Sequence, residues 1–209
     1  MQNYGGNVKY FIVIFNYFLI FQNTLLYSCD NIEIHKKIVD NILKHEGQEV
    51  LKTKYEYSKY GVKSSVLKEY NKKYKLNYKI DNLSKSEASE IDLELMKEHK
   101  IMGIERYDLK LVVYDVFYNM GPRAGATTSQ RTLNKYPKED QFPIVEDGIF
   151  GSETIRTLNQ VVDLRKFIKI FTEERLNYYF DLKNWEPNKK GWLKRIHSFF
   201  ELKDLECKK

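Results

Sequence analysis

The segment 107–120 constrains the fold most strongly, because its apolar residues recur at the i, i+3, i+4 and i+7 spacing of a helix with one apolar face. That stripe consists of Leu109, Val112, Val113, Val116, Phe117 and Met120. The Gly121-Pro122 pair that follows is a typical helix stop. The segment therefore predicts a central core helix, against which the rest of the chain must pack.

Helical spacing elsewhere predicts an all-α fold. Further helices are expected at about 31–44, 65–74, 84–99 and 128–136. Ser84 and Glu87 form a capping-box pattern at the start of the third of these. The polar segment 48–82 is expected to consist of loops around its short helix, with an irregular hairpin at its start.

The C-terminal part predicts two more capped helices and an aromatic closing segment. Ser152 is expected to cap one helix and Asp163 the next. Their expected inward residues are Ile155, Leu158, Val161 and Val162 in the first, and Leu164, Phe167, Ile168 and Phe171 in the second. The segment 137–151 is expected to be a loop, and 178–200 to close back on the core.

Composition limits the class of protein and the kind of partner. With 42% hydrophobic and 14% aromatic residues and only 4 prolines, the 209-residue chain is expected to fold, as one core or a core with a smaller lobe. The net charge of +6 favours an anionic partner. Lysine and arginine alternate with acidic residues and form no run, which argues against nucleic acid and leaves acidic lipid or cell wall.

The N-terminal segment predicts export. An apolar run occupies 10–21 after Lys9, about the length of a signal-peptide core and shorter than a spanning helix needs. Leu26-Tyr27-Ser28-Cys29 resembles a bacterial lipobox, in which the cysteine becomes lipidated. Ordinary cleavage and an uncleaved anchor are the alternatives. Residues 1–28 are therefore expected to be a signal peptide or membrane anchor of a protein that is periplasmic or membrane-anchored and faces the cell wall.

Glu46 is the candidate catalytic acid. It stands at the end of the first helix, before a glycine and a polar loop, where a carboxylic acid can project into a cleft and donate a proton. The same position also suits a solvated surface glutamate. The surrounding motifs have to decide between these two interpretations.

Two of these motifs are Ile42-Leu43-Lys44-His45-Glu46-Gly47 and Ser58-Lys59-Tyr60-Gly61-Val62. They resemble the I-L-x-x-E-G-G start and the end of the D-x-G-G-x-T-x-x-G-I loop in family 108 of the glycoside hydrolases, which are lysozyme-like bacterial and phage muramidases. Asp115-Val116-Phe117-Tyr118-Asn119-Met120-Gly121 is similar to its F-D-x-x-V-N-x-G helix. Gln130 stands where its L-Q element falls.

The resemblance continues to about residue 200. The segment 147–154 is similar to the D-G-x-x-G-x-x-T stretch, and Arg175, Tyr178 and Tyr179 to R-x-x-Y-Y. Gly191-Trp192-Leu193-Lys194-Arg195 is similar to G-W-x-x-R. The resemblance implies a lysozyme-like catalytic part at 30–122, a peptidoglycan-binding part at 123–209, Glu46 as general acid, peptidoglycan as substrate and no cofactor.

The chain departs from the family pattern immediately after the candidate acid. Gln48 replaces the second glycine of E-G-G, and the Asp and Gly-Gly of the following loop are absent. Glycoside hydrolysis needs a second group that activates water or stabilises the oxocarbenium ion. Glu56 is the nearest carboxylate, Glu49 is a poorer candidate, and Ser58 could hold a water molecule. The alternative function is a wall-binding protein that has lost catalysis.

Further side chains are expected to bind the substrate or shape its cleft. Tyr60, Tyr118 and Trp192 could stack on sugar faces. Asp115 and Asn119, one helical turn apart, could form the cleft floor or tie helices together, and Gln130 is grouped with them. The four histidines are not at metal-ligand spacing, so no metal site is expected.

Overall fold

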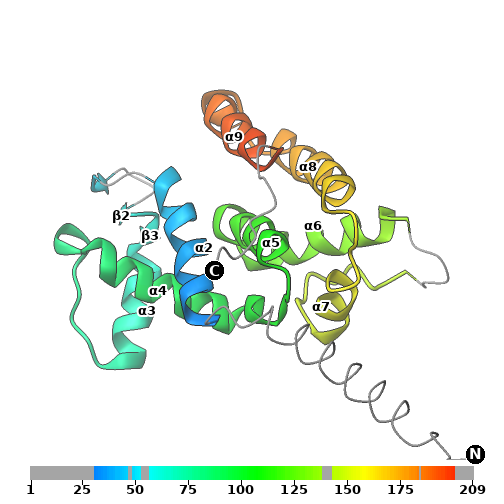
Figure 1. Ribbon diagram of the computed structural model, residues 1–209. Helices are drawn as coiled ribbons and strands as arrows, with labels where there is room; N and C mark the ends of the chain where they lie inside the picture. Colours follow the sequence, from blue (N-terminus) through cyan, green and yellow to red (C-terminus); the bar gives the residue numbers. More distant parts are fainter. Residues whose placement is uncertain (1–30, 47–48, 53–56, 138–142, 184, 201–209) are drawn as a thin grey trace, which may run out of the picture. The chain divides into compact units, whose positions relative to one another are not determined.

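The computed structural model describes residues 31–46, 49–52, 57–137, 143–183 and 185–200 (Figure 1). The chain divides into two compact units, Met1–His35 and Lys36–Lys209, and the second contains the candidate site. The predicted signal or anchor segment, with Cys29, lies outside the described residues, as does Glu56.

The first described helix is followed at once by a small sheet. Helix α2 (Asn31–His45) has a hydrophobic face that buries Ile38, Val39, Ile42 and Leu43. Strands β1 (Leu51–Lys52), β2 (Tyr57–Lys59) and β3 (Val62–Lys63) then form an antiparallel sheet in that order. Ser58 pairs with Leu51 on one side and Lys63 on the other. The irregular hairpin expected at the start of this segment is thus present.

Two helices and a short 3-10 turn enclose a small apolar core beside the sheet. Helix α3 (Ser64–Tyr74), η1 (Ile80–Asn82) and α4 (Lys85–Glu98) follow one another along the chain. The buried members of this core are Val62, Leu67, Ile80, Leu83, Ala88 and Ile91. The predicted capping box is confirmed, because Ser84 Oγ accepts from the Glu87 amide at 3.2 Å and Glu87 Oε2 from the Ser84 amide at 2.7 Å.

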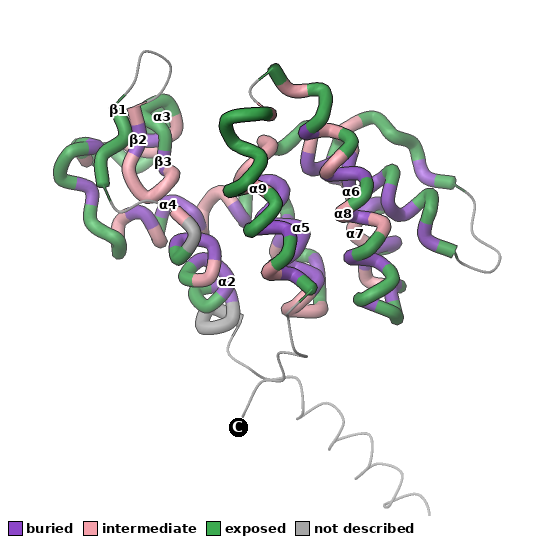
Figure 2. The backbone as a smooth tube through the Cα atoms, turned by 90° about the horizontal axis from the view of Figure 1, so that it is seen from above, coloured by how far each residue is buried: buried purple, intermediate pink, exposed green. Residues whose placement is uncertain are grey.

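Helix α5 (Tyr107–Met120), which follows η2 (Ile101–Gly103), is the central helix (Figure 2). Every residue from Leu109 to Phe117 is buried, including Lys110 and Asp115. A helix buried on all sides carries few polar groups, and each of these needs a partner within the protein. The predicted core helix is confirmed, and the buried Asp115 becomes a constraint on everything packed around it.

Helix α6 (Pro122–Lys135) begins six residues earlier than the predicted 128–136. Gly121, with φ of 84° and ψ of 164°, turns the chain sharply, and Pro122 occupies the first helical position, where a missing N–H costs nothing. The proline that predicted the end of α5 is therefore also the start of α6, with no turn segment between them.

The last three helices are α7 (Ser152–Leu158), α8 (Leu164–Phe180) and α9 (Trp185–Phe200). Asp163 caps α8 as predicted, accepting from the Lys166 amide at 3.0 Å. Ser152, in contrast, is the first helical residue, and Gly151 holds the cap position without a side-chain bond. Val162 was predicted to face inward but is 84% exposed, because α7 ends at Leu158 and leaves it in the connecting segment.

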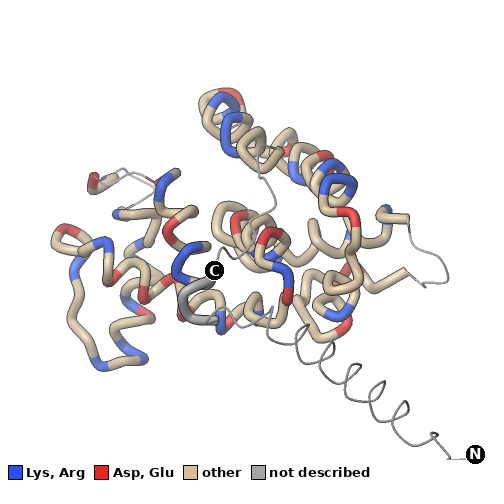
Figure 3. The backbone as a smooth tube through the Cα atoms, in the orientation of Figure 1, with Lys and Arg blue, Asp and Glu red and all other residues tan. Residues whose placement is uncertain are grey.

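The C-terminal helices pack onto the central helix and onto one another. Helix α5 contacts α6 and α8, α6 also contacts α7 and α8, and α8 contacts α9. Basic and acidic residues are interspersed along these elements (Figure 3). No helix in the described part of the chain is long and apolar enough to cross a bilayer.

The close approach of α5 and α6 gives a first prediction. A Cβ added at Gly125 would lie 2.6 Å from the Phe117 ring and 3.0 Å from the Phe117 Cα, so Gly125→Ala must push the two helices apart. We expect a loss of about 1–3 kcal/mol in the free energy of unfolding. Gly191 in α9 has open space around it, and Gly191→Ala is expected to stabilise by about 0.5–1 kcal/mol. Urea unfolding of both variants measures the difference; equal effects would contradict the described contact.

Candidate active site

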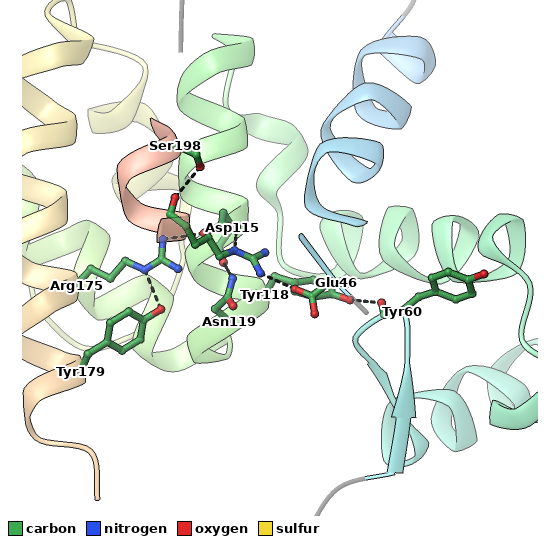
Figure 4. Close-up of polar contacts among 9 residues, drawn as sticks. Glu46, Tyr60, Asp115, Tyr118, Asn119, Arg175, Tyr179 and Ser198 are labelled. Carbon is green, nitrogen blue, oxygen red and sulfur yellow. Dashed lines mark hydrogen bonds and ion pairs between the residues drawn. The ribbon is translucent and has the colours of Figure 1, made fainter. Parts of the chain in front are cut away.

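A chain of ion pairs connects Glu46 to the core of the protein (Figure 4). Arg195 Nη1 donates to Glu46 Oε1 at 2.5 Å, and Arg195 Nε donates to Asp115 Oδ1 at 2.6 Å. The other oxygen of Asp115 accepts from Arg175 Nη1 at 2.7 Å. Four charged side chains, from the end of α2 and from α5, α8 and α9, thus form one bonded series.

This series becomes less accessible from Glu46 inward. The Glu46 side chain is 19% exposed and that of Arg195 9%, whereas those of Arg175 and Asp115 are 2% and 1% exposed. Glu46 is therefore the member of the series that solvent or a ligand can reach. The deeper three hold it in place and are too enclosed to contact a polymeric substrate.

An aromatic series continues from the arginines toward the surface. Arg175 Nε donates to the Tyr179 hydroxyl at 2.9 Å, and the Tyr179 ring stacks on Trp192 with centroids 4.3 Å apart. Trp192 in turn lies 6.0 Å from Trp185. Trp192 and Trp185 are both partly exposed. Flat partly exposed rings of this kind suit the apolar faces of sugars, and both lie on α9, the helix that carries Arg195.

Tyr118 ties the β2–β3 turn to the central helix beside this site. Its hydroxyl donates to the Tyr60 carbonyl oxygen at 2.8 Å. Tyr60 and Gly61 both have positive φ, of 51° and 72°, and a Cβ at Gly61 would lie 2.2 Å from the Tyr118 oxygen. Glycine is therefore required at this turn both by backbone conformation and by the approaching phenol.

The charges of the site balance one another. The carboxylates Glu46 and Asp115 face two guanidiniums, which gives the buried series no net charge. Burial works against the charged form of Arg195, but Asp115 and Glu46 more than offset it and raise its pKa above the ordinary value. One Nη2 atom on each arginine is buried without a hydrogen-bond partner among the described residues.

A further carboxyl group, Asp92 of α4, lies buried near Glu46. Asp92 is 0% exposed, and neither of its carboxyl oxygens has a hydrogen-bond partner among the described residues. Tyr114 donates to its backbone carbonyl at 3.0 Å and leaves the carboxyl group unpaired. Burial, reinforced by the charge of Glu46, raises the pKa of Asp92 well above its ordinary value. Asp92 therefore keeps its proton to higher pH than an exposed aspartate does.

The charges of Asp92, Glu46 and Arg195 all act on the Tyr118 hydroxyl group. Its pKa is raised well above the ordinary value, first by burial and then by Asp92 and Glu46, while Arg195 acts in the opposite direction. The pKa of Tyr114 is raised by burial and by Asp92. Both phenols therefore remain neutral donors beside the two carboxyl groups.

The residues predicted from the central helix lie deep in the site. Asp115 is fully buried, and both of its oxygens are bound by arginine. Asn119 Nδ2 donates to the Asp115 backbone carbonyl at 2.7 Å. Asp115 thus ties α5 to α8 and α9, whereas the Asn119 bond lies within α5, and a contact of this pair with substrate stays a prediction. Ser58 is likewise buried, in the middle strand of the sheet.

The Gln130 side chain is hydrogen-bonded to the 147–149 loop. Its amide nitrogen donates to Asp147 Oδ1 at 2.8 Å and to the Ile149 carbonyl at 3.1 Å, and its oxygen accepts from the Gly148 amide at 2.9 Å. Gln130 is 2% exposed. Its predicted contact with substrate remains a prediction; the geometry shows a side chain fully used in shaping the 147–149 loop.

A hollow of about 530 Å³ opens at the α5–α6 corner. Its lining includes Gly121, Arg123, Arg131 and Tyr178. Arg123 and Arg131 of α6, with Tyr178 and Glu174 of α8, give this hollow a polar lining of both charges. No group of three or more metal-binding side chains occurs within the described ranges.

Neither Asp92 nor a role for the two arginines was predicted from the sequence. Arg175 and Arg195 had been noted only as members of the R-x-x-Y-Y and G-W-x-x-R patterns. Asp92 left one signal, since it is four residues from both Ala88 and Met96 and so falls on the buried face of α4. A charged residue on an apolar stripe marks either a paired charge or a functional carboxyl group.

Comparison with known proteins yields a fold and no family. Neither a protein-family model nor a curated protein matches the sequence. Among solved structures, that of SagA from Brucella abortus is similar, with a TM-score of 0.63 over 80% of this chain and 91% of the other. Sequence identity is 15%, so the likeness establishes a shared fold alone. The predicted all-α, lysozyme-like fold is confirmed.

The buried ion pairs predict a large stability effect at Asp115. Asp115→Asn leaves the buried Arg175 without a counter-charge and Arg195 with Glu46 alone, and we expect it to lower the free energy of unfolding by about 3–5 kcal/mol. The matched change Glu98→Gln removes an exposed pair with Lys73 and should cost less than about 1 kcal/mol. Chemical denaturation compares the two variants, and similar losses would show that the buried series adds little.

Asp92 predicts a pH-dependent stability effect. Because its pKa is raised on folding, the folded state keeps a proton that the unfolded chain releases above the ordinary value of 3.8. Its stabilising contribution is therefore complete below that value and is lost as pH rises. Asp92→Asn, which stays neutral, should be more stable than the wild type at neutral pH, and the gain should vanish in acid. Thermal unfolding across pH measures this; a gain independent of pH would contradict it.

Proposed function

We propose that this protein is a peptidoglycan hydrolase of the muramidase type, related to family 108 of the glycoside hydrolases, with Glu46 as its general acid. One observation carries the proposal. Glu46, Asp115, Arg175 and Arg195 were singled out in four separate motifs spread over 149 residues, and they lie in one bonded series. If the motif matches had arisen by chance, these four residues would not be expected to lie together in the folded protein.

The surroundings of Glu46 support this chemistry. A glycosidase protonates the leaving oxygen of the scissile bond, the bond breaks with its electron pair on that oxygen, and water adds to the sugar. Glu46 is the accessible end of the series, so it can reach a bound glycan. Trp192 on α9 and Tyr60 in the β2–β3 turn carry rings that could stack on sugars of a bound glycan.

The second catalytic group is assigned to the segment between the first two strands. Glu56 lies there, outside the described residues, next to β2. As the second carboxyl group, Glu56 would act either as nucleophile or as the base that activates water. Ser58 is the alternative, as a holder of that water.

A specific observation favours the second candidate, a wall-binding protein without catalysis. Glu46 Oε1 is 2.5 Å from Arg195, so the carboxylate is seen in an ion pair and not as a free acid. In a wall-binding protein of this kind, the ion-pair series would stabilise the fold, and the protein would bind the wall without cleaving it. The two candidates differ in one property, the ability of Glu46 to deliver a proton.

Wall hydrolysis by Glu46→Gln tests the proposal. Glutamine keeps an oxygen that can accept from Arg195 but has no proton to give, so we expect turbidity clearing of purified bacterial walls to fall about a hundredfold or more. Glu69→Gln, an exposed change on α3, is the matched control and should clear walls like the wild type. Circular dichroism would confirm that both variants fold.

The outcomes separate the two candidates. A wild type that releases no soluble glycan but still pellets with walls would establish the binding protein. Clearing by Glu46→Gln at the rate of the control would remove Glu46 from the mechanism.

Export of the protein is a further part of this proposal, since peptidoglycan lies outside the cytoplasmic membrane. Mass spectrometry of the protein recovered from its native cell should find a lipid on Cys29 or cleavage nearby. An intact first residue on cytoplasmic protein would contradict export.

A further inference from the structure

The positive charge of the chain is concentrated in one segment. Residues 51–80 contain nine lysines and two glutamates, so this segment alone has a net charge of +7, against +6 for the whole chain. All other residues together therefore have a net charge of −1. The proposed chemistry at Glu46 makes no use of this basic segment, which calls for an explanation of its own.

The described residues of this segment form one small body, which we name the cationic lobe. It consists of the three-stranded sheet, α3 and the loop that leads to η1, around a core that includes Val62, Leu67 and Ile80. Asn71 holds that loop against α3, because its Nδ2 donates to the Tyr78 carbonyl at 2.8 Å and its Oδ1 accepts from the Tyr78 amide at 3.0 Å. The exposed lysines of the lobe are Lys52, Lys63, Lys68, Lys72, Lys73, Lys75 and Lys79.

Most of these lysines have no ion-pair partner among the described residues. The exception is Lys73, which pairs with Glu94 at 3.0 Å and with Glu98 at 2.7 Å. Lys52 lies over a neutral group instead, with its Nζ atom 5.2 Å from the centroid of the Tyr57 ring. A tyrosine ring attracts an ammonium group without cancelling its charge. The lobe therefore presents most of its positive charge to solvent.

Stability of α3 does not explain the lysines that it carries. Lys68 and Lys72 lie one turn apart on the same side of the helix, where like charges repel each other and destabilise it. The helix dipole favours a cation in the last turn, where Lys72 lies, but not in the middle, where Lys68 lies. Lys75, which ends the helix, has a φ of 55°, a conformation that favours glycine. Lysine at these positions thus indicates a use for the charge.

An anionic polymer is the partner that complements such a surface, because many weak ion pairs can form along it together. The substrate of the proposed function is such a polymer, since the peptide side chains of peptidoglycan carry free carboxylates. The lobe is also close to the candidate acid. Strand β1 begins five residues after Glu46, which limits the separation of the two backbones to about 18 Å. Tyr118 further ties the β2–β3 turn of the lobe to α5.

We propose that the cationic lobe is a docking surface for the carboxylates of peptidoglycan, and that it holds a wall strand while Glu46 acts on that strand. This inference rests on the proposed function and adds the part of the substrate that carries the charge. Lysine suits the task, because its ammonium group is a point charge on a flexible stem and can follow irregularly spaced anions. The charges are exposed, so added salt weakens the attraction.

Pelleting of the full chain with purified bacterial walls at low salt tests the docking. The triple change Lys68→Gln, Lys72→Gln and Lys75→Gln removes three charges from the lobe. At roughly a fivefold loss for each lysine beside an anionic surface, we expect wall affinity to fall about a hundredfold. Changing the same three residues to arginine keeps the charge and should leave affinity near the wild-type value. A wild type that does not pellet with walls would overturn the inference.

The matched control removes the same number of charges from another surface. It combines three changes of exposed residues on α8, Arg165→Gln, Lys166→Gln and Lys169→Gln. We expect it to lose less than about threefold in affinity, because salt screens exposed charges that are distant from the bound polymer. An equal loss in both triple variants would show that net charge alone drives binding, and the lobe would not be the docking surface. Circular dichroism checks that each variant folds.

The identity of the anion is tested on the wall, with the wild-type chain. Amidation of the wall carboxylates should weaken binding about as much as the triple change in the lobe does, whereas extraction of phosphate-containing polymers should leave binding unchanged. Binding that survives amidation but is lost with the phosphate polymers would overturn the assignment to carboxylates. So would tighter binding to phosphatidylglycerol vesicles than to walls. Because this arm uses no variant, it decides even if the triple variant does not fold.

Clearing rates separate this inference from the proposed function. In the triple glutamine variant of the lobe, the wall concentration that gives half-maximal clearing should rise about as much as affinity falls. The rate at saturating wall should stay near that of the wild type, because Glu46 is untouched. Wild-type affinity in this variant would overturn the docking surface and leave the proposed function standing. If no form of the protein clears walls, the proposed function fails, while pelleting still measures the docking.

Discussion

Asp115 is the constraint on which the rest of the structure depends. It lies in the middle of a helix that is buried from Leu109 to Phe117, so its charge has to be matched inside the protein. Arg175 and Arg195 bind one oxygen each, and this fixes α8 and α9 against α5. Arg195 also donates to Glu46, through its Nη1 atom. A buried charge in the core thereby determines where the candidate acid stands.

The helices could largely be predicted from the sequence, because their boundaries depend on local chemistry. The Ser84–Glu87 capping box and the Asp163 cap act within a few residues, and both are present. Predictions failed where a residue had two possible meanings. Pro122 can follow one helix or open the next, and it does both, since the Gly121 backbone allows a sharp corner. Val162 carried the right period but lies beyond the end of α7.

The candidate site was predictable in its members but not in its contacts. The order of the motifs along the chain identified Glu46, Asp115 and Asn119 as candidate site residues. The later motifs in the same order contain Arg175 and Arg195. Which carboxylate each guanidinium binds depends on how α5, α8 and α9 cross, and no local pattern encodes that. Asp92 was missed for a related reason: its isolation from partners is a property of the packed interior. A sequence shows only a polar residue on an apolar helix face.

The ion pairs also bear on how the two predicted parts of the chain depend on each other. Glu46 and Asp115 belong to the predicted catalytic part, while both arginines belong to the predicted wall-binding part, 149 residues from Glu46 in the case of Arg195. Separating the parts after residue 122 would leave Asp115 as a buried carboxylate without a counter-charge, at a cost of about 3–5 kcal/mol, comparable to the whole stability of many small domains. A module joined only for wall affinity would not supply partners to the interior of its neighbour. The geometry instead makes α8 and α9 part of the candidate site, so that Glu46 is held in place only when α9 has folded.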